Sequence, residues 1–265
     1  MDHLTKHDLL SNKQFGFIQG RSTVLQLLHV LDEWTEGKDQ GLPIEAVYMD
    51  FQKAFDSVPH RRLLHKLSRY GIGGPLLNWI EDFLNGRTQK VRVNGKLSTE
   101  AQVKSGIPRG SVLGPVLFVL YINDLPDNIS TNVYLFSDDT KIFRTGTPPI
   151  GAQDDHLQLD LNYLQSWSNT WLLKFHPDKC KRLFVTRHHP DTRQAPLRLT
   201  PLGEDPSPLA SSTNEKDLGI TIDTKLKFDT HIDNIVNRAN RNMGIIRRTF
   251  QYLDISLFSP YIKPV

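Results

Sequence analysis

Cysteine is almost absent from this sequence, because Cys180 is the only one in 265 residues. A single thiol cannot close an intrachain disulfide, so we expect no disulfide partner within the chain. It also cannot supply the paired cysteines of a structural zinc site, and the ten histidines show no ligand spacing relative to it. Sparse cysteine is typical of a reducing compartment, which predicts an intracellular protein of the cytoplasm, the nucleus or both.

Long hydrophobic runs are missing as well. No stretch is long and apolar enough to cross a bilayer, and the first residues lack the apolar segment of a signal peptide, so we expect no membrane partner. The net charge of +3 is only mildly basic, which permits a polyanionic partner without requiring one. With 38% hydrophobic and 23% charged residues, the composition is that of a folded globular protein.

Two adjacent aspartates, Asp138 and Asp139, separate two apolar runs of strand-forming residues. This pattern predicts a β-hairpin with both carboxylates at its tip. Neighbouring acids repel each other, so a fold that keeps both ionised needs cations nearby. A second apolar strand, residues 45–50, also ends on an acid, Asp50. Aspartates are common at solvated turns, but three that converge on one point would suit a pair of Mg²⁺ ions.

The rest of the chain predicts an α+β fold, because the spacing of strands and long helices is not that of a regular βαβ array. Ser22 is expected to cap a helix that carries Leu25, Leu28, Leu31 and Trp34 near helical spacing. Further helices are predicted over residues 61–70, 75–84, 116–123, 152–171 and 232–250.

Other segments lack a helical pattern. An Asn-Gly pair predicts a hairpin over residues 91–97. We expect a polar loop over residues 37–43, and a loop or loosely structured connector over residues 187–214, which are rich in Pro, Ser and Thr. A single short strand is expected over residues 217–222.

Seven short motifs follow one another along the chain. They are Gln14-Phe15-Gly16-Phe17 with Gly20-Arg21-Ser22-Thr23, then residues 50–60, 106–115 and 120–125, then Phe136-Ser137-Asp138-Asp139, Lys179-Cys180 and Leu218-Gly219-Ile220. In this order they resemble the reverse transcriptases of non-LTR, LINE-type retrotransposons of the jockey-like group. The resemblance covers nearly the whole chain, so a chance match of this many ordered motifs is negligible.

The resemblance implies the palm of a right-hand polymerase, with truncated fingers and a truncated helical thumb. In that scheme residues 1–43 are partial fingers, 44–186 the palm with the catalytic acids, 187–222 the palm–thumb connection and 223–265 a partial thumb. The expected partners are an RNA template, a DNA primer and deoxynucleoside triphosphates. Finger strands upstream of Met1 and an endonuclease domain are expected to be missing from this chain.

The resemblance also assigns roles around the acids. Asp50 and Asp138 become the direct ligands of two Mg²⁺ ions, which Mn²⁺ could replace, with help from the Phe51 carbonyl. Asp139 becomes a secondary ligand or an electrostatic support. All three acids are therefore the expected catalytic residues, while Asp56 is expected to cap or pair locally rather than bind metal.

Nucleotide contacts follow from the same resemblance. Phe55 is expected beneath the nucleotide sugar, where it would exclude a 2′-hydroxyl, although an aromatic after a strand usually faces the core. Pro108, Arg109 and Gly110 lie in a loop expected to contact nucleotide and template, although the loop could be only a tight turn before a helix. Lys179 is expected near the leaving pyrophosphate, although an ordinary surface lysine would fit its spacing. Arg21 is a template-strand candidate, and the arginines of residues 232–250 are either a solvated face or contacts to primer–template phosphates.

Four positions depart from the family pattern. Phe136-Ser137 precede the acids where the family usually has Tyr-Ala, and His176 stands where an asparagine is usual. Arg109 replaces a glutamine, and a longer cationic side chain there is expected to disturb nucleotide placement. The leading hypothesis is an RNA-directed DNA polymerase, and we expect the chain on its own to be a poor one. Its rivals are an inactive retroelement fragment that at most binds nucleic acid and a metal-dependent nuclease.

Overall fold

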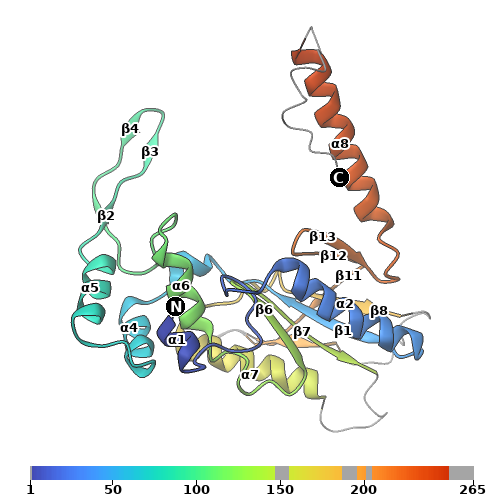
Figure 1. Ribbon diagram of the computed structural model, residues 1–265, viewed down its shortest axis with the longest axis horizontal. Helices are drawn as coiled ribbons and strands as arrows, with labels where there is room; N and C mark the ends of the chain where they lie inside the picture. Colours follow the sequence, from blue (N-terminus) through green and yellow to red (C-terminus); the bar gives the residue numbers. More distant parts are fainter. Residues whose placement is uncertain (1, 147–154, 187–195, 201–204, 251–265) are drawn as a thin grey trace. The chain divides into compact units, whose positions relative to one another are not determined.

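The computed structural model describes residues 2–146, 155–186, 196–200 and 205–250 (Figure 1). The chain forms two compact units, residues 1–213 and 214–265. The fold combines helices with a mixed sheet, which agrees with the α+β prediction at that level. Within the described ranges, no helix has the length and hydropathy needed to span a bilayer.

A five-stranded sheet organises the first unit, in the order β11-β8-β1-β7-β6. All neighbours pair antiparallel except β11 and β8, which are parallel. The central strand β1 is almost entirely buried, as its run of apolar residues predicts. The strands are β1 (Ile44–Met49), β6 (Asn132–Phe136), β7 (Asp139–Thr145), β8 (Lys181–Val185) and β11 (Ala210–Ser212).

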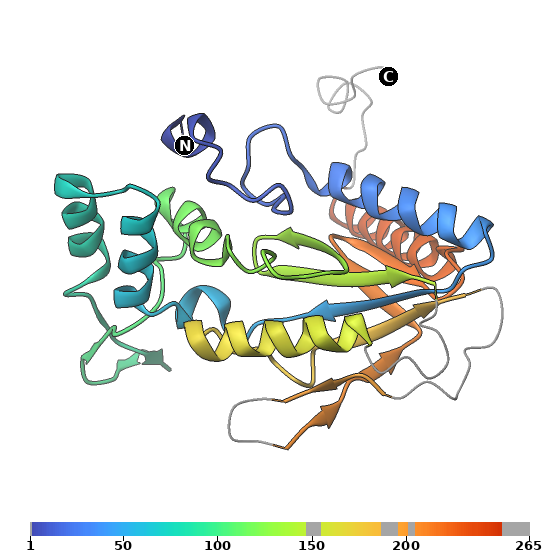
Figure 2. The ribbon, with the colours of Figure 1, turned by 90° about the horizontal axis from the view of Figure 1, so that it is seen from below.

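Helices cover both faces of this sheet. Ile142 and Phe143 are neighbours on β7 and therefore point to opposite faces. Phe143 contacts Trp34 of α2 (Thr23–Asp39), with the rings in T-shaped geometry. Ile142 belongs instead to the core that includes the buried leucines of α7 (His156–Trp171). Figure 2 shows both helices running along the sheet.

The first of these helices confirms the predicted cap but corrects the predicted face. Ser22 Oγ accepts a hydrogen bond from the Leu25 amide at 3.1 Å. The buried apolar side chains are Leu27, Val30 and Trp34, whereas Leu28 is exposed. The predicted stripe was out of phase because several leucines lie on neighbouring positions of this helix.

The predicted loop over residues 37–43 is wrong at its start, because α2 continues to Asp39. Gly37 lies inside the helix and faces β7. A Cβ atom at this position would lie 2.5 Å from Thr145 Cγ2. The glycine is therefore explained by close helix–strand packing rather than by a turn.

Helices α4 and α5 agree with the predicted bounds to within one residue, whereas α7 begins four residues after its predicted start and α1 was not predicted. Helix α6 begins three residues before its predicted start and is apolar on all sides. It is buried accordingly in the middle of the core. The other helices of the first unit are α1 (Asp2–Lys6), α3 (Ala54–Ser57), α4 (His60–Arg69), α5 (Gly74–Leu84) and α6 (Leu113–Ile122).

A two-part ladder extends beyond α5 in Figure 1. Its outer part joins β3 (Arg92–Val93) to β4 (Lys96–Leu97), and its inner part joins β2 (Thr88–Gln89) to β5 (Ala101–Gln102). Asn94 and Gly95 have φ of 49° and 80°, so both adopt the left-handed conformation of a type I′ turn. The hairpin prediction for residues 91–97 is confirmed.

The expected loop or loose connector over residues 187–214 is wrong for its described parts. Residues 187–195 and 201–204 lie outside the described residues. Elsewhere in this range, β9 (Arg198–Leu199) pairs with β10 (Ser207–Pro208), and β11 extends the main sheet. The Gln158 side chain binds the Arg198 backbone through both amide atoms, at 2.8 and 2.9 Å. This contact with α7 holds β9 in place.

The second unit corrects the predicted single strand over residues 217–222. Leu218 and Gly219 have φ of 47° and 96° and form a turn. The turn joins β12 (Asn214–Asp217) to β13 (Ile220–Asp223) as a hairpin. The predicted C-terminal helix is confirmed as α8 (Asp229–Thr249), whose arginines lie on an exposed surface.

Candidate active site

The sheet register brings the three predicted acids to one edge. Met49, the last residue of β1, pairs with Thr140 of β7, so Asp50 leaves the sheet beside the start of β7. Asp139 is the first residue of that strand and pairs with Phe136 across the turn. Asp138 lies in the turn itself. The strand register thus confirms the predicted hairpin, with the two acids at its tip and Asp50 beside it.

The backbone around Asp50 is held firmly, whereas its carboxylate is open to solvent. The His176 amide donates to the Asp50 carbonyl at 2.7 Å, and the Asp50 amide approaches Cys180 Sγ at 3.5 Å. The Asp50 side chain is 43% exposed, and its Oδ1 lies 3.5 Å from Lys179 Nζ. Lys179 therefore lies beside Asp50, although its proposed contact with pyrophosphate stays a prediction.

The only cysteine supports this site without being reactive. Cys180 is fully buried. Burial raises the pKa of its thiol to about 11, so the group stays neutral at physiological pH. The thiol packs beside the Asp50 backbone.

The oxygen donors at this edge have the chemistry that magnesium prefers. Carboxylates from Asp50 and Asp138 are hard ligands, as is a backbone carbonyl. Phe51 forms a β-bridge with Phe175, but the hydrogen bonds of that bridge use the Asp50 carbonyl and the Gln52 amide. The Phe51 carbonyl takes no part in it. Across the described residues, however, no group of three or more His, Cys, Asp or Glu is already gathered as a metal site.

Phe55 packs against the core with one face of its ring. Its ring stacks on Phe118 of α6, with centroids 4.4 Å apart, so one face packs against the core. The side chain is only partly buried. The core contact is thus confirmed, and the proposed contact with a nucleotide sugar stays a prediction.

The glycine-punctuated loop before α6 is fastened to α3. The Gly106 amide donates to Val58 O and the Ile107 amide to Phe55 O, both at 2.8 Å. Gly106 has φ of +92°, and a Cβ there would lie 2.7 Å from Asp56 O. Only glycine fits this close approach. The loop is therefore more than a free turn, because it brings Arg109 beside the segment that carries Phe55.

Arg109, the main departure from the family pattern, has an acidic partner. Its Nε and Nη2 donate to Asp56 Oδ1 and Oδ2 at 3.2 and 2.9 Å, a bidentate pair. The two side chains are 67% and 51% exposed. Asp56 thus pairs with a residue far along the chain, and the arginine is directed toward α3 in this structure.

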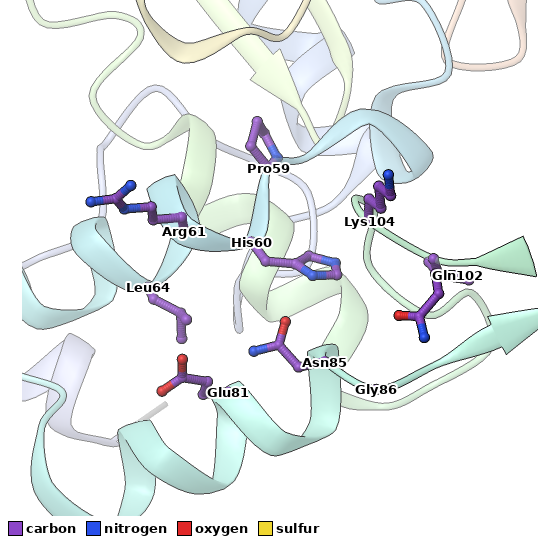
Figure 3. Close-up of a pocket in the computed structure, with 10 residues that line it drawn as sticks. Pro59, His60, Arg61, Leu64, Glu81, Asn85, Gly86, Gln102 and Lys104 are labelled. Atoms are coloured by element: carbon purple, nitrogen blue, oxygen red, sulfur yellow. The ribbon is translucent and has the colours of Figure 1, made fainter.

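A separate cavity lies between the start of α4, the end of α5 and the strand β5 (Figure 3). Its volume is about 760 Å³, and none of the predicted site residues lines it. Among its polar lining residues, His60 places Nε2 2.8 Å from Gly106 O. The cavity therefore adjoins the loop before α6 but does not contain the acids.

Comparison with known proteins points to one family. The sequence matches the family described as "Reverse transcriptase (RNA-dependent DNA polymerase)" over residues 1–242. It is 30% identical to the "Probable RNA-directed DNA polymerase from transposon BS" of Drosophila melanogaster, over 93% of this chain and 27% of that protein. It is 31% identical to the "RNA-directed DNA polymerase from mobile element jockey" of the same species, over 84% of this chain and 24% of that protein. The chain thus spans about a quarter of the length of these relatives.

Among solved structures, the fold is similar to that of apo telomerase from Candida tropicalis truncated from its C-terminal domain. The TM-score is 0.55 at 9% sequence identity, with 86% of this chain and 42% of that chain covered. At this identity the similarity concerns the fold alone.

Proposed function

Because the chain belongs to the reverse transcriptase (RNA-dependent DNA polymerase) family, we propose that it extends a DNA primer on an RNA template. The observation that carries this proposal is the convergence of Asp50 with the Asp138–Asp139 turn at one sheet edge. The two similar Drosophila proteins are named as RNA-directed DNA polymerases.

In the proposed reaction the primer 3′-hydroxyl oxygen attacks the α-phosphorus of a deoxynucleoside triphosphate. A bond forms between that oxygen and the phosphorus, the bond to the leaving oxygen breaks, and pyrophosphate departs. A pair of Mg²⁺ ions would supply the positive charge that this reaction needs at its oxygens. Asp50, Asp138 and the Phe51 carbonyl would hold them, and Asp139 would add negative charge. The reaction needs no nucleophile from the protein.

Other residues would bind and orient the nucleotide. Lys179 forms an ion pair with Asp50 and would contact the pyrophosphate. Phe55, fixed from behind by Phe118, would present its other face to the sugar. Pro108, Arg109 and Gly110 would contact the incoming nucleotide and the template. Correct alignment of the reacting groups is worth about 7–11 kcal/mol when fully realised, so these contacts matter as much as the acids.

We further propose that the chain follows the layout of a right-hand polymerase. Residues 1–43 would belong to the fingers, 44–186 to the palm, 187–222 to the connection and 223–265 to the thumb. The boundary between the two compact units falls inside the proposed connection. Exposed arginines on α8 would contact primer–template phosphates and make binding sensitive to salt. An intracellular location is proposed from cysteine usage alone.

Primer extension by the purified chain, on an RNA template with Mg²⁺, tests the proposal. We expect short products that depend on the metal and are lost on Asp138→Asn. Extension over many nucleotides would contradict the expectation that this chain alone is a poor polymerase. A primer that becomes shorter would favour a nuclease. Bound nucleic acid with neither extension nor metal binding would favour an inactive fragment.

A further inference from the structure

A short N-terminal segment lies alongside the strand that leads to the acid turn. Gln14 forms a parallel β-bridge with Leu135 of β6. The Phe15 amide donates to Leu135 O at 2.7 Å, and the Leu135 amide donates to Lys13 O at 2.9 Å. The segment thus adds an isolated parallel β-bridge beside β6, one that the sequence pattern did not predict.

The Gln14 side chain reaches from this segment into the acid turn. Its Oε1 accepts a hydrogen bond from the Ser137 amide at 2.9 Å and another from the Gly16 amide at 2.7 Å. Gln14 is 0% exposed, and Ser137 is also buried. A buried backbone amide without a partner is costly, so this acceptor stabilises the turn in its observed form.

The observed form of the turn is one that a serine does not adopt readily. Ser137 has φ of 56°, in the left-handed region. A residue with a Cβ is disfavoured there, so an external contact is needed to hold it. Asp138 follows directly, and the direction of its side chain therefore depends on the conformation at Ser137.

Gly16 brings the segment against the backbone of the turn. A Cβ at this position would lie 2.4 Å from the Ser137 nitrogen and 3.0 Å from the Phe136 carbonyl carbon. Both neighbours are backbone atoms, so a side chain here could be accommodated only if the turn moved. The glycine is explained by this close approach.

Arg21 closes the loop that presents Gln14. Its Nη1 donates to the carbonyls of Ser11 at 3.1 Å and Asn12 at 3.0 Å, and also to that of Gln14. The guanidinium lies 5.3 Å from the centre of the Phe15 ring. Arg21 was expected to be a template contact, but here its guanidinium binds carbonyls of its own loop.

We propose that Gln14 is a positioning residue for the acid turn. Its amide oxygen holds Ser137 in the left-handed conformation and so sets where the Asp138 carboxylate lies. Arg21 and Gly16 hold Gln14 and the turn at the required separation. The conformational part of this inference stands on the contacts alone, and its consequence for metal binding rests on the proposed function.

The matched comparison is between two buried glutamines. Gln14→Met keeps the length and burial of the side chain but removes the acceptor. Gln26 is 1% exposed, and within the described part of the chain neither atom of its side-chain amide has a hydrogen-bond partner. Gln26→Met therefore changes a buried amide that holds no turn.

Hydrogen exchange of the Ser137 amide tests the conformational part. We expect exchange at Ser137 to be at least tenfold faster in Gln14→Met and unchanged in Gln26→Met. The Val47 amide in the central strand reports any general loss of stability, and it should exchange at the wild-type rate in both variants. Unchanged exchange at Ser137, or an equal rise at Ser137 and Val47, would overturn the proposal.

Manganese binding, followed by electron paramagnetic resonance on the purified chain, tests the consequence for the site. We expect Gln14→Met to raise the Kd for Mn²⁺ at least fivefold and Asp138→Asn to raise it further. If Asp138→Asn leaves Mn²⁺ binding intact, the proposed function fails at its metal site. If Asp138→Asn weakens binding and Gln14→Met does not, the positioning role fails and the proposed function survives.

A rescue experiment separates positioning from a general packing role. Glycine adopts the left-handed conformation without help, and among the described residues the Ser137 hydroxyl has no partner to lose. Adding Ser137→Gly to Gln14→Met should restore most of the lost Mn²⁺ affinity. No recovery would contradict the proposal.

If Gln14→Met does not fold, the same hydrogen-exchange test can be made with Gly16→Ala, which places a Cβ against the Ser137 backbone. Its control is Gly73→Ala, because Gly73 has φ of −141° and a Cβ there meets no atom within 4 Å. Exchange at Ser137 should rise in the first variant alone. An equal effect of both variants would overturn the proposal.

Discussion

The two ends of strand β1 carry acids of opposite character. Glu45, near the start, has a side chain that is 1% exposed, whereas that of Asp50, just past the end, is 43% exposed. Glu45 lies within the buried strand β1 and Asp50 directly follows it, and both lie beside β7, which pairs with β1. The two carboxylates therefore differ in their exposure to solvent.

Glu45 is enclosed by cations. Its Oε1 lies 2.5 Å from Arg182 Nη2, and its Oε2 binds Arg144 on the neighbouring strand. Arg144 also pairs with Asp155, whose side chain accepts from the Leu157 amide and caps α7. Each charge has a partner of opposite sign, so the cluster holds helix to sheet.

Asp50 has a different environment. Its only cationic contact among the described residues is Lys179, at 3.5 Å and with both side chains exposed. An ion pair of this kind contributes little stability, because water screens it. The two carboxylates therefore have different roles. The buried, neutralised carboxylate of Glu45 supports the fold, whereas the exposed carboxylate of Asp50 can bind a ligand.

The largest expected effect comes from removing acids at the open end. Asp50→Ala or Asp138→Ala should reduce primer extension by roughly a hundredfold or more, as loss of a transition-state electrostatic contact does. The midpoint of thermal unfolding should change little, because these side chains are not buried. Asp139→Ala should have a smaller effect on extension. Near-normal extension by either of the first two variants would reject the site.

Neutralising the buried acid Glu45 should lower stability and leave metal binding unchanged. Glu45→Gln leaves Arg144 and Arg182 without their shared partner, so we expect the free energy of unfolding to fall by about 3 kcal/mol. Urea unfolding measures this, with Asp50→Asn as the matched control for an exposed acid. Mn²⁺ binding by the folded variant should match wild type. If Glu45→Gln proved as mild as Asp50→Asn, the distinction between the two ends would not hold.

Phe55 offers a test of specificity at the open end. Phe55→Ala should remove the clash with a 2′-hydroxyl and raise ribonucleotide incorporation relative to deoxyribonucleotide by roughly tenfold. Single-nucleotide extension assays give the ratio. Phe83→Ala is the control, because Phe83 also stacks on an aromatic ring and is also partly buried. An unchanged ratio in an active Phe55 variant would leave the residue with its core role only.

A smaller change is expected where Arg109 meets Asp56. Arg109→Gln restores the usual family residue and should raise extension severalfold, since small misplacements of a substrate cost much rate. Stability should change by less than about 1 kcal/mol, because the pair is exposed. Asp56→Asn should lower extension, since it releases the arginine from α3. Lower activity in Arg109→Gln would show that the arginine is an adapted part of this site.

Lys66 extends the comparison to a buried cation. It lies 2.6 Å from Tyr121 O, forms an ion pair with Asp124 and sits 3.7 Å from the centre of the Trp171 ring. Burial lowers its pKa to about 8, although Asp124 opposes the shift.

Between that value and the usual pKa of about 10.4, the unfolded chain therefore binds more protons than the folded one. The contribution of Lys66 to stability should increase as pH rises through this window. Urea unfolding of wild type and Lys66→Met at about pH 7 and about pH 9.5 measures this contribution. The free energy of unfolding of wild type, relative to that of the variant, should be larger at the higher pH. Comparison with the variant cancels other groups, such as Cys180, that titrate in the same range. A constant difference would show that Lys66 is charged alike in both states.

Local signals determined much of the fold without tertiary information. The Ser22 cap, the Asn94-Gly95 turn and the glycine after α4 each act within a few residues, so the helix and hairpin predictions succeeded. The strand Lys181–Val185 was missed, because two of its five residues are cations and its pairing partner β1 is distant in sequence. Short strands such as β11 have no periodicity of their own and form only on an existing sheet.

The acids themselves were identifiable from the sequence, because each lies next to a strongly apolar run and their order matches a known series of motifs. Their contacts were not. Gln14 meets Ser137 across 123 positions, Arg109 meets Asp56 across 53 and Lys179 meets Asp50 across 129. A side chain's local propensity carries no information about such distant partners. The packing of the N-terminal segment on β6 determined which amide Gln14 would reach, and the packing of the loop before α6 on α3 determined the contact of Arg109. The pairing of β8 with β1 brought Lys179 beside Asp50.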